Sequence, residues 1–131
     1  MSKLTELVHE ANWKEEKHVP VIECPDQVKN GEVFHVKTSI GKEIAHPNTT
    51  EHHIRWISLY FHGDGDKFPF QIGHFEFTAH GESLEGSNKG SVYTHHEVTV
   101  ALKLGKSGTL QALSFCNIHG LWQSEKAIKV F

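Results

Sequence analysis

The order of apolar and polar positions along the chain predicts a protein built almost entirely of β-strands. Short segments in which apolar residues alternate with polar ones, or run together, are separated by turn residues at roughly ten-residue intervals. About seven short strands with this spacing are typical of an immunoglobulin-like antiparallel β-sandwich, although a small barrel would give a similar pattern. The predicted strands are residues 19–23, 33–40, 54–61, 68–79, 98–104, 109–115 and 121–131.

Some of these segments carry more specific expectations. Residues 54–61 are apolar on both sides, so we expect a strand that is buried on both faces. Gly73 is expected at a β-bulge. Residues 98–104 and 109–115 flank a Gly-containing link and are expected to pair as a hairpin. Residues 4–11 predict a short irregular or helical N-terminal segment of about two turns.

Composition and charge restrict the function. The 131 residues fit one domain, residues 1–131, with a net charge of -3, so neither a nucleic acid nor an anionic membrane is expected as a partner. No apolar run is long enough to span a bilayer, and the N-terminus lacks the apolar region of a signal peptide, which predicts a cytoplasmic protein. The chain holds 12 histidines but only two cysteines, Cys24 and Cys116, which are too few for a disulfide framework.

Potential metal ligands concentrate in three segments, residues 16–18, 46–53 and 116–119. Each is predicted at a strand end or in a loop, and loops from distant segments gather at one end of a sandwich, so the three could meet at one ion. Taken singly, each segment has an ordinary explanation. Histidines near strand ends usually lie on the surface, Cys116 could be a buried apolar residue, and a charged run such as residues 14–17 is usually solvated.

The types of donor atom limit the candidate metals but do not identify one. Imidazole suits zinc, copper, iron and nickel, and two cysteines cannot complete a four-cysteine site. A sandwich with histidines and one cysteine also fits a cupredoxin-like electron carrier. Such copper sites commonly carry an axial methionine, and the only methionine here is Met1, although glutamine can replace it. A sandwich that binds partners and holds no stoichiometric metal is a further alternative.

Four stretches of the sequence closely resemble superoxide reductases, and more narrowly the single-iron members called neelaredoxins. The stretches are EKHVPVIE (16–23), HPNTTEHHIRW (46–56), FEFTAHGES (75–83) and CNIHGLW (116–122), and the resemblance extends from about Trp13 to Trp122. It implies one mononuclear iron per chain, with an axial cysteine and four equatorial histidines. By motif these ligands are Cys116, His18, His46, His52 and His119.

The resemblance also assigns roles that the strand pattern could not. It selects His52 over His53 as the ligand. It implies that Glu16 can occupy the sixth position of the ferric ion, and that Lys17 lies beside the open position, where its charge can attract an anionic substrate.

The implied reaction is the reduction of superoxide to hydrogen peroxide, with one electron from a donor such as rubredoxin and two protons. The short members of the family imply a homotetramer. Larger relatives carry a second iron held by four cysteines, which this chain lacks. Cys24 and His80 are expected to be structural. The other histidines are expected on the surface: His9, His35, His62, His74, His95 and His96.

Overall fold

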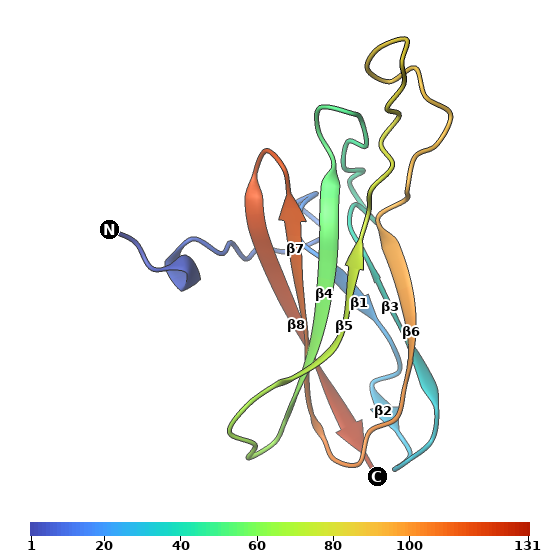
Figure 1. Ribbon diagram of the computed structural model, residues 1–131. Helices are drawn as coiled ribbons and strands as arrows, with labels where there is room; N and C mark the ends of the chain where they lie inside the picture. The colour runs from blue at the N-terminus through green and yellow to red at the C-terminus, as the bar shows by residue number, and fades with distance from the viewer.

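The computed structural model describes all 131 residues and shows two β-sheets packed face to face (Figure 1). One sheet has five strands in the order β2-β8-β7-β4-β5, and the other has three in the order β1-β3-β6. The only helical element is the 3-10 helix η1 (Leu4–Glu6). The strands are β1 (Val21–Glu23), β2 (Gln27–Val28), β3 (Phe34–Ser39), β4 (Ile54–Gly63), β5 (Phe70–Glu76), β6 (Glu97–Leu102), β7 (Gly108–Cys116) and β8 (Gly120–Val130).

Alternation along the strands places the core between the sheets. In β7, buried residues alternate strictly with half-buried ones, as expected when one face of a strand meets the opposite sheet. The apolar side chains form two clusters. One contains Val36, Phe61 and Leu110. The other contains Ile57 and, fully buried, Cys116, so the core itself delivers a thiol to one end of the sandwich.

The predicted all-β sandwich is confirmed. β4 lies between β7 and β5. The burial on both faces predicted for residues 54–61 is found only at residues 57–59, since Arg55 is exposed and Trp56 and Tyr60 are half-buried. The register between β4 and β5 shifts beside Gly73, where a bulge was expected. β2 was not predicted, and it pairs with β8 in parallel, whereas all other strand pairs are antiparallel.

The hairpin predicted from residues 98–104 and 109–115 is wrong. β6 pairs with β3, while β7 pairs with β4 and β8, so the link between β6 and β7 crosses from one sheet to the other. Leu104, within that link, is buried in the core cluster between the sheets. A turn sequence is compatible with either connection, and burial of Leu104 favours the crossing.

The N-terminal segment also differs from its prediction. Helical structure is limited to η1, none of whose residues is buried. A segment this short has too few internal hydrogen bonds to hold a longer helix without a surface to pack on. No helix in the structure is long and apolar enough to cross a membrane.

Three connections meet at one end of the sandwich: the β7–β8 turn, residues 40–53 before β4, and residues 77–96 between β5 and β6 (Figure 1). These connections position the site.

Candidate metal centre

The β7–β8 turn brings Cys116 and His119 together. Cys116 pairs with Gly120 across the strands, which leaves a three-residue loop. Gly120 has a φ of 80°, a left-handed conformation that glycine adopts without strain and that three-residue hairpin loops require. The turn directs the backbone N–H of His119 toward Cys116 Sγ at 3.4 Å, and His119 Nδ1 lies 3.8 Å from the same sulfur.

The loop before β4 supplies two more imidazoles, His46 and His52. Gly41 allows the chain to turn back on itself, since its φ is 80° and a Cβ there would lie 2.6 Å from the backbone nitrogen of His46. His46 Nδ1 is 2.6 Å from the carbonyl oxygen of Pro47. The hydroxyl of Thr49 accepts a hydrogen bond from the backbone N–H of His52 at 3.0 Å, which closes the loop.

His18 comes from the segment before β1. It is buried, and Ser114 donates a hydrogen bond to its carbonyl oxygen, which ties the segment to β7. The ring stacks on Trp122, with centroids 4.9 Å apart and planes inclined by 13°. Its Nδ1 faces a carboxylate oxygen of Glu16 at 2.7 Å, which leaves Nε2 free to face the site.

The four imidazoles form a closed quadrilateral. Neighbouring rings are 4.6 to 5.0 Å apart between centroids, and His18 and His52, on opposite corners, are 6.4 Å apart. Donor atoms of His18, His52, His119 and Cys116 all lie within 4.8 Å of one another. We call these four imidazoles the ligand group: His18, His46, His52 and His119.

The residues present fit a metal ion. The Nε2 atoms of His46 and His52 are buried and have no hydrogen-bond partner, an arrangement that is costly unless another group satisfies the lone pair. His18 Nε2 and His119 Nδ1 lie 3.1 Å apart, close enough to share one ion. Four imidazoles and one thiol also differ from the trigonal two-histidine, one-cysteine set of a blue-copper centre.

The environment of His18, His46 and His52 favours the neutral imidazole, the form that binds a metal. Burial lowers the pKa of His46 from 6.5 to about 3, and the neighbouring histidines oppose protonation further. Burial likewise lowers the pKa of His18 and of His52, and the charge of Lys17 acts in the same direction on both.

Glu16 and Lys17 lie beside the ligand group. The carboxylate of Glu16 accepts hydrogen bonds from the backbone N–H and the ring of His18. Burial alone would raise the pKa of Glu16, yet these hydrogen bonds lower it, so the group is ionised at neutral pH. In this structure Glu16 therefore supports a ligand from outside; its place as a sixth ligand stays a prediction. Lys17 is half-buried and has no carboxylate within ion-pair distance.

Two supporting residues were missed by the sequence analysis. Asn117 Oδ1 accepts a hydrogen bond from the backbone N–H of His53 at 2.9 Å, and its Nδ2 donates to the carbonyl oxygen of Glu51 at 2.8 Å, so it joins the two ligand-bearing loops. Trp122, besides stacking on His18, donates from Nε1 to the carbonyl oxygen of His119 at 3.2 Å. The only sequence signal was their position within the CNIHGLW stretch.

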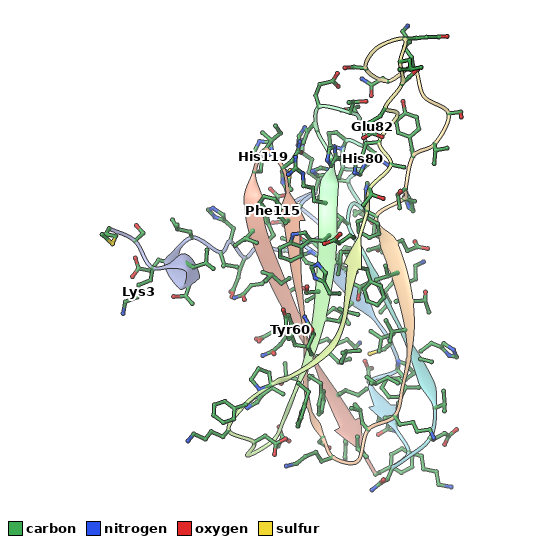
Figure 2. All side chains as sticks on the ribbon, in the orientation of Figure 1. Lys3, Tyr60, His80, Glu82, Phe115 and His119 are labelled. Atoms are coloured by element: carbon green, nitrogen blue, oxygen red, sulfur yellow. The ribbon has the colours of Figure 1, made fainter.

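A second set of buried histidines lies nearby without joining the quadrilateral. His53 and His80 stack face to face, with centroids 3.5 Å apart, and we call them the stacked pair. His53 Nδ1 faces the carbonyl oxygen of Thr49 at 2.9 Å, and His80 Nε2 faces that of Phe77 at 2.7 Å. Figure 2 shows His80 and His119 at the same end of the sandwich.

The prediction that His96 lies on the surface is wrong. Its exposed fraction is 4%, and its ring centroid lies 5.8 Å from that of His46. His96 immediately precedes β6 and contacts the ligand group only at this edge. The predicted free cysteine, Cys24, is confirmed as unpaired and half-buried.

Fold and site together define a β-sandwich metalloprotein with one centre of mixed imidazole and thiolate donors. Comparison with known proteins identifies the family. The desulfoferrodoxin family model matches residues 10–125, so the chain belongs to the desulfoferrodoxin family.

Similar proteins and solved structures agree with this family assignment. Neelaredoxin from Megalodesulfovibrio gigas is 60% identical, with 96% of this chain and 97% of the relative covered. Superoxide reductase from Pyrococcus furiosus is 52% identical, with 96% and 99% covered. A crystal structure of a Thermotoga maritima protein superimposes with a TM-score of 0.98 at 53% identity, covering 100% of this chain and 99% of that one. Superoxide reductase (neelaredoxin) from Archaeoglobus fulgidus gives a TM-score of 0.87 at 54% identity, covering 94% and 98%.

Proposed function

We propose that this chain is a superoxide reductase with one mononuclear iron, held by the ligand group and Cys116. The observation that carries the proposal is the convergence of buried, unpartnered imidazole nitrogens on a buried cysteine. Relatives at 52% identity and above, named neelaredoxin and superoxide reductase, supply the reaction. Each turnover adds one electron and two protons to superoxide and releases hydrogen peroxide.

Iron, when bound, supplies the one-electron couple, and a thiolate donor increases the electron density available to the substrate. The chain's own residues do the rest. Cys116 is fully buried, whereas His119 is exposed, so the thiol approaches from the protein interior and the solvent side of the quadrilateral is left for the substrate. The imidazoles of His18, His46 and His52, held neutral by burial, add no positive charge of their own to the site.

Lys17 is the residue that attracts and orients the anion. Its charge adds to burial, the main cause, in lowering the pKa of His18 and of His52, and no carboxylate neutralises it within ion-pair distance. A positive group at this point counteracts the net charge of -3 on the whole chain. It also stabilises negative charge on the bound oxygen species.

The carboxylate of Glu16 has two roles in this proposal, one toward His18 and one toward the metal. In the structure it holds Nδ1–H of His18 and so fixes the ring plane and the nitrogen that faces the metal. With iron bound in its ferric state, the same carboxylate would serve as a further ligand and would assist the departure of the product, since carboxylate oxygen prefers the harder ion.

The physiological setting is part of the same proposal. A rubredoxin-type protein donates the electron, four copies assemble as a homotetramer, and the enzyme acts as a single domain, residues 1–131, in the cytoplasm. The family membership and the charge pattern support this setting.

Metal analysis and reaction stoichiometry test the function. The purified protein should contain one iron per chain and no copper, and its oxidised form should be blue from thiolate-to-iron charge transfer. With a reduced donor present, each superoxide consumed should yield one hydrogen peroxide and no oxygen. Oxygen release, or one peroxide for every two superoxides, would indicate dismutation and contradict the proposal.

A further inference from the structure

Residues 1–8 form an arm that leaves the sandwich sideways beyond β8, away from both sheets (Figure 1). The arm is held to the body at its base, where His9 bridges to Trp122 through two backbone hydrogen bonds. Beyond this bridge, the backbone hydrogen bonds of the arm join only its own residues. Leu4 and Leu7 are 65% and 53% exposed, so the apolar side of the arm is not covered by its own chain.

The outer face of the five-stranded sheet presents a matching apolar surface. Half-buried Tyr60, Leu113 and Phe115 lie at alternate strand positions that point away from the core, and Phe115 stacks on Trp56. Beside them is a hollow of about 570 Å³. Its lining includes Trp13, Tyr60, Pro69 and Leu113, with Glu10 and Glu125 among the polar residues.

Figure 2 separates the two features: Lys3 lies far out on the arm, while Tyr60 and Phe115 lie on the sheet. An arm that points away from its own body cannot fill its own hollow. A second copy can, because Glu10 at the base of each arm also lines the hollow, so a twofold axis near the two bases would bring each arm to the partner's hollow.

Charge is complementary as well. The outer part of the arm carries the N-terminal amine and Lys3, and the hollow is lined by Glu10 and Glu125. The only acidic residue among residues 1–8 is Glu6, nearer the base. The superposition on the Thermotoga maritima chain spans this whole chain, arm included, so the extended arm is also the geometry of a crystallised relative.

We propose that two copies of the chain exchange arms, with Leu4 and Leu7 of each copy docked in the hollow on the outer sheet face of the other. Arm exchange requires only two copies of the chain. The inference therefore rests on the proposed homotetramer only where it assumes that copies assemble. The arm is remote from the ligand group in sequence, whereas the hollow is lined by Val19, next to His18, and by Leu113, three residues before Cys116.

Sedimentation of the iron-loaded protein over a concentration series tests the exchange. The variant Leu4→Glu with Leu7→Glu should raise the dissociation constant between copies by about tenfold or more, since each 1.4 kcal/mol of lost contact corresponds to tenfold. Iron content and the blue colour should not change. The matched control is Leu84→Glu, a fully exposed leucine on the connection between β5 and β6.

A cross-link then locates the arm. One chain carries Leu7→Cys and a second carries Gln111→Cys, at a residue that lines the hollow, each in a Cys24→Ser background, and the two are mixed and oxidised. A disulfide between the two chains is expected, with Leu84→Cys in place of Leu7→Cys as the unreactive control.

The outcomes separate the exchange from the assembly. A chain that is monomeric at all concentrations overturns both. An assembly that Leu4→Glu with Leu7→Glu leaves intact, or that Leu84→Glu weakens equally, overturns the exchange and leaves the tetramer standing. The absence of the mixed disulfide, in an assembly that the arm variant weakens, removes the hollow as the docking site and so overturns the proposal as stated.

Discussion

Two sets of histidines lie at the same end of this sandwich, and only one is built to hold a metal. In the ligand group, the Nε2 atoms of His46 and His52 have no partner. In the stacked pair, His53 and His80 lie in parallel and one ring nitrogen of each faces a backbone carbonyl. Burial does not separate the two sets, because His46 and His53 are each 6% exposed, whereas the unpartnered nitrogens do. A buried imidazole with its hydrogen bonds already made contributes to packing, whereas one left unpaired requires a further partner.

The stacked pair and nearby hydrogen bonds also hold the loop that carries His46 and His52. The stacked pair anchors the ligand loop, because His80 stacks on His53 and its carbonyl oxygen accepts a hydrogen bond from Thr50 Oγ1 at 2.7 Å. Asn48 Nδ2 reaches the carbonyl oxygen of Thr94 at 3.1 Å, and Asn88 Oδ1 accepts from the backbone N–H of Thr50 at 2.8 Å. Satisfied polar groups hold the scaffold so that unsatisfied ones can hold the ion.

The largest expected effect comes from removing the thiol at the centre of the ligand group. Cys116→Ser should abolish the charge-transfer colour and lower the rate of superoxide reduction by more than the roughly 10–100-fold that loss of a partner behind a ligand costs. Visible spectra and peroxide yield measure both. Cys24→Ser is the control and should change neither; a blue, active Cys116→Ser protein would remove Cys116 from the ligand set.

Exchanging alanine for each member of the His52–His53 pair tests the comparison directly. His52→Ala should weaken iron binding, because an unpartnered nitrogen is lost from the site. His53→Ala should keep one iron per chain and instead lower thermal stability, since the ring it stacks on loses its contact. Iron analysis and thermal melts decide between the two. The reverse assignment would show that the ligand lies one position further along the chain.

Acid should destabilise the metal-free protein partly through His96. Burial lowers the pKa of His96 in the folded state to about 4, from 6.5. Between these pH values the unfolded chain binds more protons, so the free energy of unfolding falls as pH drops, by roughly 3 kcal/mol for this group. Urea titrations at pH 7 and 4.5 measure it. His96→Asn should show a smaller loss than the parent, with exposed His35→Asn as control; equal losses in parent and His96→Asn would exclude His96 as a cause.

Lys17 provides positive charge beside the ligand group, and its removal tests whether that charge attracts superoxide. Lys17→Ala should slow the second-order reaction with superoxide by a few-fold and reduce its dependence on salt, because exposed charges act over about 10 Å at roughly 0.1 M salt. Lys17→Arg should retain the attraction, and Lys17→Glu should be slower than Lys17→Ala. Pulse radiolysis across a salt series gives the rates. Identical rates in all three variants would exclude Lys17 from substrate capture.

The smallest expected effect is that of Glu16 variants on the rate of the initial bimolecular reaction with superoxide. Glu16→Ala should leave the initial bimolecular reaction nearly unchanged while altering the ferric spectrum, because the carboxylate holds His18 from outside in this structure and we expect it to ligate only the oxidised ion. Glu16→Gln, which can still accept from His18 Nδ1–H, should retain more of the parent's ferrous properties. A large loss in the first step would contradict both roles.

Much of the fold could be predicted because alternation is a local property. The strand β7 alternates strictly, and the sequence placed it within one residue of its observed ends. The pairing of β6 could not be predicted from its turn, since the choice of partner depended on burying Leu104 between the sheets. The prediction that His96 lies on the surface was wrong for the same reason. Its neighbours along the chain give no sign that its ring centroid lies 5.8 Å from that of His46.

The sequence by itself determined every strand except β2, the supply of histidines, and the three segments in which potential ligands are concentrated, because each depends on residue type and short spacing. Only the tertiary structure decided which nitrogens are free. His46 and His52 are unpartnered, His53 and His80 face carbonyls, and Glu16 turns to His18, because each outcome is set by atoms that approach from distant segments. A hydrogen bond between loops depends on distances that only packing of the two sheets creates, so the difference between a ligand and a structural histidine becomes visible only in the folded chain.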